Sequence, residues 1–183
     1  MQTIQVKEVM VPLKDYATVS ENATMYDAVL ALETAQAEFD QSRYRHRAVL
    51  VFNDQNKIVG KISQLDLLKA LEPKYNQIVN TEALSRTGYS LDYIESLSHT
   101  AFWNKPLNDI CRKAADMQVK NFMYAPGKGE FIEESAELNE AVHRLIVGQH
   151  HSLLVTRNKE IVGVLRLTDV FKLVSERIKT CKQ

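Results

Sequence analysis

Apolar and polar positions along this chain follow a pattern that occurs twice. The segment 58–66, Ile-Val-Gly-Lys-Ile-Ser-Gln-Leu-Asp, returns as segment 161–169, Ile-Val-Gly-Val-Leu-Arg-Leu-Thr-Asp. Each copy follows a short apolar run typical of a strand, and it leads into a run with the apolar spacing of a helix. A repeat fixes how the whole fold is built, so it is identified before single elements are assigned. The chain therefore contains one structural unit twice.

The repeat extends toward the N-terminal side of each copy. Residues 6–32 align with residues 119–145 without a gap. The offset is ten residues smaller from 58 to 69, and we expect most of the extra residues to lengthen the first helix over 36–43. The identical pairs are Val6/Val119, Lys7/Lys120, Met10/Met123, Glu21/Glu134, Ala23/Ala136, Ala28/Ala141, Val29/Val142 and Leu32/Leu145.

Each copy predicts the order strand, helix, strand, strand, helix. Thr24 and Asp27 have the spacing of a capping box, which predicts a helix start at Thr24. Asn53-Asp54-Gln55-Asn56 has the composition of a turn between two apolar runs, which predicts a hairpin. The predicted elements are strands 18–20, 48–52 and 58–62 with helices from Thr24 and at 67–71, then strands 130–132, 152–156 and 161–165 with helices 138–147 and 170–178.

These elements divide the chain into a first repeat at 1–71, a connector at 72–118 and a second repeat at 119–183. The connector matches neither copy. Its apolar residues around 91–97 have helical spacing, and it is too long for a structureless loop in a compact fold. We therefore expect a helical connector that carries the protein-specific output.

Composition narrows the classes of protein to which this chain can belong. The 183 residues are 45% apolar and 25% charged, which is typical of a globular protein. The 23 basic and 23 acidic residues cancel, so no global field attracts nucleic acid or an anionic membrane. Two cysteines are too few for a disulfide framework. No signal peptide and no apolar run of about 20 residues are found, so we expect a cytoplasmic protein outside the membrane.

The repeat, with its closing Gly-x-Ile-Ser-x-x-Asp, resembles the CBS domain, named after cystathionine beta-synthase. Segment 6–10, Asp27-Ala28 and segment 47–51 also fit that pattern. Two copies in one chain resemble a Bateman module. The resemblance implies an α/β (α+β) fold of two β-α-β-β-α units, packed sheet to sheet about a pseudo-twofold axis with two clefts. Many members bind AMP, ADP, ATP or S-adenosylmethionine there and regulate an attached or partner protein.

Ser63 and Asp66 have two interpretations. Ser63-x-x-Asp66 is itself a capping box, which explains both residues without a ligand. The resemblance implies that Asp66 accepts hydrogen bonds from ribose hydroxyls and that Ser63 lies beside the phosphates. The free amides at a helix N-terminus suit an anion, so the two interpretations are compatible.

The second copy departs from this pattern. Arg166 stands where the hydroxyl residue belongs, and Asp169 keeps the ribose position. An arginine can replace the phosphate contact, because its forked guanidinium suits phosphate. It can also fill the cleft or pair with a neighbouring carboxylate. Binding at the second site therefore remains open.

The pairs His46-Arg47 and His150-His151 precede the middle strands at matching positions. The resemblance implies that such pairs reach phosphates across a cleft, whereas solvated strand ends are the simpler explanation. Arg43, Arg45 and Arg47 alternate, so an extended segment would place them on one side. No metal site is expected, because two adjacent histidines cannot close a zinc tetrahedron.

Ala28 and Ala141 occupy the family's small-residue position on the first helix of each copy. Ordinary helix packing explains them. The resemblance implies in addition that the small side chain leaves room for adenine.

The sequence thus predicts a non-catalytic, energy-sensing regulatory module with an adenine nucleotide as its regulatory ligand and no required cofactor. We find no nucleophile elbow, Walker loop or metal motif, which makes an enzyme the weaker alternative. A ligand-free interaction module, its clefts closed by side chains such as Arg166, is a further alternative. We expect a homodimer closed by twofold symmetry, a regulated partner protein, and neither nucleic acid nor membrane as partner.

Overall fold

The computed structural model describes residues 3–40, 42–71 and 109–181 of the chain. The first unit contains β2 (Thr18–Ser20), α1 (Met25–Glu38), β3 (Ala48–Phe52), β4 (Ile58–Ser63) and α2 (Gln64–Ala70). The second contains β5 (Phe131–Glu133), α7 (Leu138–Val147), β6 (Ser152–Arg157), β7 (Glu160–Arg166) and α8 (Leu167–Thr180). Outside these units lie β1 (Val11–Pro12), α6 (Ile110–Asp116) and 3-10 turns at Val6–Glu8, Leu13–Asp15, Val119–Asn121 and Lys128–Glu130.

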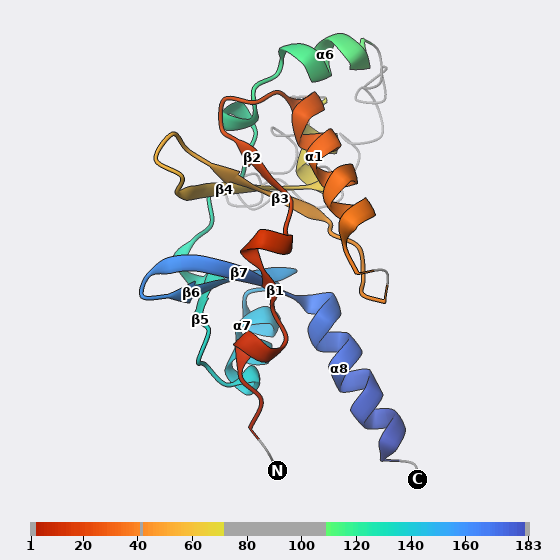
Figure 1. The fold of residues 1–183 in the computed structure, drawn as a ribbon, viewed down its shortest axis with the longest axis vertical. Helices are drawn as coiled ribbons and strands as arrows, with labels where there is room; N and C mark the ends of the chain where they lie inside the picture. Colours follow the sequence, from red (N-terminus) through yellow and green to blue (C-terminus); the bar gives the residue numbers. More distant parts are fainter. Residues whose placement is uncertain (1–2, 41, 72–108, 182–183) are drawn as a thin grey trace, which may run out of the picture.

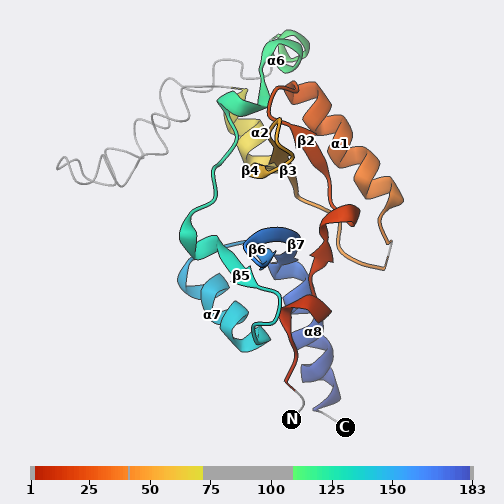
Figure 2. The same cartoon turned by 60° about the vertical axis from the view of Figure 1, so that its left-hand side comes forward.

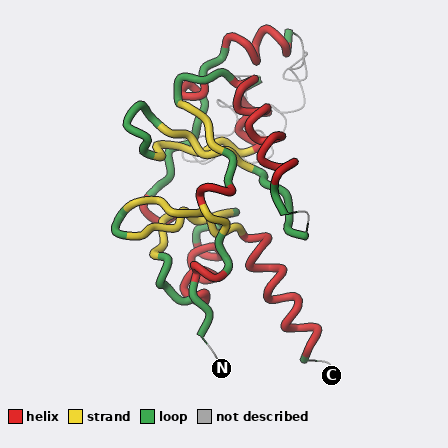
Figure 3. Tube along the Cα trace, viewed as in Figure 1, coloured by secondary structure: helices red, strands yellow, loops and turns green. Residues whose placement is uncertain are grey.

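The two units have the same topology, which confirms the predicted order of elements. In the first sheet, β2 pairs parallel with β3 and β3 pairs antiparallel with β4. In the second, β5, β6 and β7 repeat this arrangement, and β1 is added beside β7. Both hairpins shift register at corresponding places, Val51/Phe52 and Val155/Thr156. The repeat in the sequence is therefore a repeat of structure, with the strands of both units in yellow in Figure 3.

The two sheets face one another across a shared core (Figure 1). Leu50 of β3 and Leu154 of β6 lie in one buried cluster together with Val11, Tyr16 and Val164. Helix α1 covers the outer face of the first sheet and α7 that of the second, as Figure 2 shows. Burial of apolar side chains on both faces is what holds each sheet between its helices and the other unit.

Each unit is completed by the arm that precedes the other unit. Val6 is fully buried in the core cluster of the second unit, and its amide donates to Ala136 O at 3.0 Å. Val119 is fully buried in the first unit, and its amide donates to Ala23 O at 2.8 Å. The two units are therefore joined by crossed arms as well as by the contact between their sheets.

Helix α1 ends earlier than predicted. Its last residue is Glu38, because Phe39 leaves the helical conformation at ψ 150°. Asp40 then forms a turn, its carboxylate accepting the amide of Ser42 at 2.8 Å. Hydrogen bonds from the Ser42 side chain and from its amide lower the pKa of Asp40, since they stabilise the charged carboxylate. The expectation that residues 36–43 are helical is therefore wrong beyond Glu38.

Most other boundaries fall within a few residues of the prediction. Strand β5 starts at Phe131 instead of Glu130, and α8 starts at Leu167, three residues early. Of the expected helical connector, only residues 109–118 are described, and they contain α6; the rest lies outside the described residues. Helix α8 projects away from the sheets (Figure 1). Within the described ranges, no helix combines the length and apolar character needed to cross a bilayer.

Candidate functional site

A cleft of about 430 Å³ lies between the two units, and we call it the first cleft. It opens where β4 passes into α2, the junction that carries the Ser-x-x-Asp motif of the first repeat. Its lining residues are Tyr16, Arg45, Arg47, Ala48, Lys61, Ser63, Gln64, Leu65, Asp66, Tyr124, Glu130, Gln149, His150, His151, Ser152, Arg166, Leu167 and Thr168. The structure thus brings most of the predicted site residues together in one place.

A larger groove, of about 630 Å³, runs beside α1. Its cations, Lys14 and Arg43, lie among the carboxylates of Asp15, Glu38 and Asp40. Of the residues that the sequence analysis singled out for a ligand site, it contains only Arg43. The first cleft is therefore the stronger candidate for a ligand site.

Ser63 and Asp66 form the predicted capping box at the start of α2. The Oδ2 atom of Asp66 accepts the Ser63 amide at 2.8 Å and the Ser63 hydroxyl at 2.6 Å, and Ser63 Oγ accepts the Asp66 amide at 3.1 Å. All contacts of the carboxylate use Oδ2, and no described residue donates to Oδ1. A carboxylate oxygen has lone pairs for two donors, so Asp66 retains acceptor capacity in the cleft.

A buried carboxylate forms another wall of the first cleft. Glu130 is 2% exposed, pairs with Lys61 Nζ, and accepts the Gly127 amide at 3.1 Å. Burial raises the pKa of Glu130, but hydrogen bonds from Lys61, Tyr124 and Gly127 outweigh it and hold the pKa below its ordinary value. The same hydrogen bond to Glu130 raises the pKa of Tyr124, whose ring lies 5.3 Å from Lys61 Nζ.

The cleft also holds arginine and histidine side chains from the two units. Arg45 and Arg47 enter from the segment before β3, and neither makes a side-chain hydrogen bond or ion pair with a described residue. His150 and His151 enter from the segment before β6. Gly148 makes room for His150, because a Cβ at that position would lie 2.1 Å from the His150 ring. Unpartnered guanidinium groups around an open cleft are suited to an anionic ligand.

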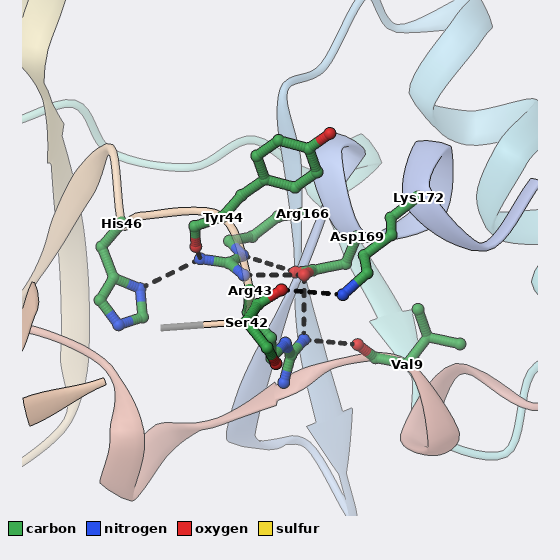
Figure 4. Close-up of polar contacts among 8 residues, drawn as sticks. All are labelled: Val9, Ser42, Arg43, Tyr44, His46, Arg166, Asp169 and Lys172. Atoms are coloured by element: carbon green, nitrogen blue, oxygen red, sulfur yellow. Dashed lines mark hydrogen bonds and ion pairs between the residues drawn. The ribbon is translucent and has the colours of Figure 1, made fainter. Parts of the chain in front are cut away.

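The corresponding position in the second repeat, the second cleft, is filled by protein side chains. Arg166 donates to Asp169 through Nε at 2.5 Å and Nη2 at 2.7 Å, and both residues are 5% exposed. The third nitrogen of Arg166, Nη1, donates to Tyr44 O at 2.8 Å (Figure 4). Of the roles left open for Arg166, pairing with the neighbouring carboxylate is the one observed. Both oxygens of Asp169 are engaged by described residues.

Arg43 belongs to the second cleft. Its Nη2 atom lies 3.1 Å from Asp169 Oδ1 and donates to Val9 O at 3.1 Å. The expectation that Arg43, Arg45 and Arg47 share one side is therefore wrong for Arg43. Arg43 differs because the turn at Asp40 prevents the extended backbone that strict alternation requires.

His46 is fully buried rather than exposed to the first cleft. Its ring packs against Tyr16 and Phe39 at centroid distances of 4.6 and 4.2 Å, and its Nδ1 lies 3.4 Å from Arg166. Desolvation, together with the nearby Arg166 charge, lowers the pKa of His46 to about 4. Burial likewise raises the pKa of Tyr16 to about 12. His46 is therefore neutral near pH 7 and lies in the core, whereas its counterpart His150 lines the open cleft.

Ala28 and Ala141 are fully buried in the cores between helix and sheet of the first and second units. Neither lines the first cleft. Tyr124 and Glu130, by contrast, line it and were not predicted. A signal was present, because the gapless alignment places them opposite Val11 and Ala17, apolar residues of the first copy.

Comparison with known proteins places the fold. A family model for the CBS domain matches residues 6–73 and 128–176. No curated protein sequence matches the chain.

Solved structures match over nearly the whole chain. CBSX2 from Arabidopsis thaliana is 16% identical, covers 97% of this chain and 99% of its own, and has a TM-score of 0.60. A structure of CBSX2 in complex with AMP is 18% identical, with coverages of 96% and 98% and a TM-score of 0.58. A CBS domain-containing protein from Bacillus anthracis is 17% identical, with 96% coverage of both chains and a TM-score of 0.61. At these identities the likeness establishes a shared fold.

Proposed function

This chain belongs to the CBS-domain family, and on that premise we propose that it is a non-catalytic regulatory module that binds one adenine nucleotide per chain in the first cleft. The second cleft is then a structural contact and not a ligand site. The module acts on a partner protein or through a second copy of itself.

The observation that carries this proposal is the difference between two equivalent aspartates. Asp66 lines an open cleft and has Oδ1 without a donor among the described residues. Asp169 is buried, and its two oxygens accept from Arg166 and Arg43. Asp66 can therefore accept the two ribose hydroxyls of a nucleotide at Oδ1, whereas Asp169 is buried and keeps one acceptor site, on Oδ2, which is too few for both hydroxyls.

The charges of the first cleft support a phosphorylated ligand. Arg45 and Arg47 lie in the cleft without anionic partners among the described residues, and His150 and His151 line it as well. Charge-assisted hydrogen bonds from guanidinium groups to phosphate are strong and can be bidentate. We therefore assign the phosphates to this cationic wall and the ribose to Asp66. The volume of about 430 Å³ lies within the range of small-molecule sites.

The adenine base has a candidate neighbour in Tyr124, whose side chain is exposed in the same cleft. Aromatic rings stack on purine bases with little dependence on sequence or base identity. The AMP complex of CBSX2, a protein of the same fold, supports an adenine nucleotide over other phosphorylated ligands. S-adenosylmethionine, which carries no phosphate, would leave the arginines unpaired, so we rank it below AMP, ADP and ATP.

A second candidate function is dimerisation without a ligand, and an exposed apolar face of α8 favours it. Leu167, Phe171, Val174 and Ile178 lie at helical spacing and are 41%, 62%, 39% and 61% exposed. We propose that this face contributes to a homodimer in either case. Light scattering behind a sizing column should give about twice 20.9 kDa. A monomer at ~100 µM, far above the range of modest affinities, would contradict the homodimer.

A thermal-shift and calorimetric panel of AMP, ADP, ATP and S-adenosylmethionine tests the proposed function. We expect nucleotides to raise the melting temperature and ATP to remain intact during incubation. Arg47→Ala should weaken ATP more than AMP, by about tenfold for one lost charge-assisted contact. Arg177→Ala, an exposed arginine outside the cleft, is the matched control. Absence of binding by every ligand of the panel would leave the dimerisation module as the function.

A further inference from the structure

Residues 42–47, which we call the strap, run from the second cleft to the first. The beginning of the strap is attached to the second unit by two backbone contacts (Figure 4). Lys172 Nζ, on α8, donates to Ser42 O at 2.9 Å. Nη1 of Arg166, the last residue of β7 and the N-cap residue of α8, donates to Tyr44 O at 2.8 Å. One end of the strap is therefore held by the N-cap residue of α8 and by Lys172 within the helix.

The other end of the strap forms a wall of the first cleft. Arg45 and Arg47 line the cleft, and the Gln64 amide at the start of α2 donates to Arg47 O at 3.1 Å. Between the two ends, Gln36 Nε2 donates to His46 O at 2.8 Å. Within the strap, the side chains of Arg45 and Arg47 thus lie toward the first cleft. The side chains of Arg43 and His46 lie toward the second.

Arg166 belongs to both clefts. It lines the first cleft, and it also holds Asp169 and the strap in the second. Any anion that enters the first cleft therefore meets Arg45 and Arg47 from the strap and Arg166 from the N-terminus of α8. A charge placed there acts on two elements that are already hydrogen-bonded to one another.

We propose that the strap couples occupation of the first cleft by an anionic ligand to the stability of α8. This inference rests on the proposed function, and it names the contacts through which ligand binding in the first cleft affects an exposed surface. The anion draws Arg45, Arg47 and Arg166 together, which fixes the strap and, through Ser42 O and Tyr44 O, the first turns of α8. Helix α8 carries the exposed apolar face described above, so ligand binding changes the local stability of the helix that carries this face.

Hydrogen–deuterium exchange with ATP and with inorganic tripolyphosphate tests the coupling. Binding is first measured by calorimetry, so that occupancy of the cleft is known. In the wild-type protein, a saturating ligand should slow exchange of the α8 amides of residues 171–176 by about threefold or more, a local change of the kind that this method resolves. Tripolyphosphate should give part of the effect, because it supplies the charge without the nucleoside.

The decisive variants weaken the strap's attachment to α8 without touching the first cleft. Arg43→Ala/Lys172→Ala removes the Arg43–Asp169 ion pair and the Lys172–Ser42 O hydrogen bond and keeps the Arg166–Tyr44 O bond; it should still bind ATP, but the slowing of α8 exchange should fall by more than half. Lys172→Ala alone removes one contact near the surface and should lower the slowing by a smaller amount than the double variant. Lys179→Ala changes a lysine on the same helix that donates no hydrogen bond to the strap, and it should behave as wild type.

Two results overturn the inference and are distinguishable. If ATP binds the wild-type protein and α8 exchange is unchanged, or if the double variant keeps the full effect, the coupling is wrong while the proposed function stands. If neither ATP, AMP nor tripolyphosphate binds the wild-type protein, the proposed function fails and the coupling fails with it.

Discussion

Arg166 holds Asp169 through two hydrogen bonds, of 2.5 and 2.7 Å, at a position where the first repeat has Ser63 and Asp66. Both repeats keep the aspartate, yet only Asp66 faces an open cleft with an oxygen to spare. A single residue difference, serine against arginine, therefore separates a candidate ligand site from an internal ion pair. The asymmetry of the module follows from this difference.

The Arg166–Asp169 pair predicts a specific pattern of stability changes. Arg166→Met should lower the free energy of unfolding by roughly 3–5 kcal/mol, because it leaves a buried carboxylate with only Arg43. The double variant Arg166→Met/Asp169→Leu should recover part of that loss, since no buried charge remains unpaired. Urea unfolding of the four proteins of this cycle measures the coupling. If the stability change of the double variant equals the sum of the changes in the two single variants, the pair does not act as a unit.

His46 predicts a loss of stability in mild acid. Its pKa is lowered to about 4 in the folded protein, whereas an unfolded histidine has a pKa of about 6.5. Between pH 6.5 and pH 4 the unfolded chain binds a proton at this histidine and the folded chain does not. The contribution of His46 to the free energy of unfolding is therefore fully present above pH 6.5 and is lost as the pH falls toward 4. The loss amounts to roughly 3 kcal/mol.

The matched variant for His46 is His46→Phe, which keeps an aromatic ring between Tyr16 and Phe39. The ring faces the charges of Arg43, Arg166 and Asp169 in both proteins, so those charges are shared. Urea unfolding at several pH values between 7 and 4 should show a shallower decline for the variant. Parallel curves for the two proteins would refute the assignment of this decline to His46.

The crossed arms predict that the two units unfold together. Val6→Ala and Val119→Ala each remove two methyl groups from a fully buried position, at a cost of about 1–3 kcal/mol. Each change should lower a single shared transition, because each arm belongs to one unit and packs in the other. Val29→Ala, at a 39% exposed position of α1, should change the free energy by less than about 0.5 kcal/mol. Calorimetry that shows two separate transitions would contradict this account.

Features set by neighbouring residues were predictable from the sequence. The capping boxes at Thr24 and Ser63, the hairpin turn at 53–56 and helix α7 depend on local geometry, and all are found where the pattern placed them. The repeat itself was visible in the sequence because both copies have apolar residues at corresponding positions of the same fold. The CBS fold followed from that repeat and is confirmed by the family match.

Features set by distant residues were not predictable in the same way. Val6 is an apolar residue in either unit, so its sequence position says nothing about which core it enters. The same crossing brings Tyr124 and Glu130, which precede β5, into the first cleft. The direction of Arg43 depended on a turn at Asp40 that replaced the expected helix. In each case a tertiary contact decided what a local pattern left open.

The central claim is that one adenine nucleotide binds per chain, at Asp66. Asp66→Ala removes the ribose acceptor together with a helix cap, a loss of about 0.5–2 kcal/mol in stability. Asp27→Ala removes the equivalent capping box of α1, where Asp27 accepts from Thr24, outside the cleft. The two variants are thus matched for the loss of a cap and differ only in the candidate ligand contact.

Isothermal titration of ATP and AMP into wild type, Asp66→Ala and Asp27→Ala tests this claim most directly. The account predicts about one nucleotide per chain, an affinity within about twofold of wild type for Asp27→Ala, and an affinity roughly ten- to a hundredfold weaker for Asp66→Ala. Two nucleotides per chain, or equal affinities for Asp66→Ala and Asp27→Ala, would contradict it.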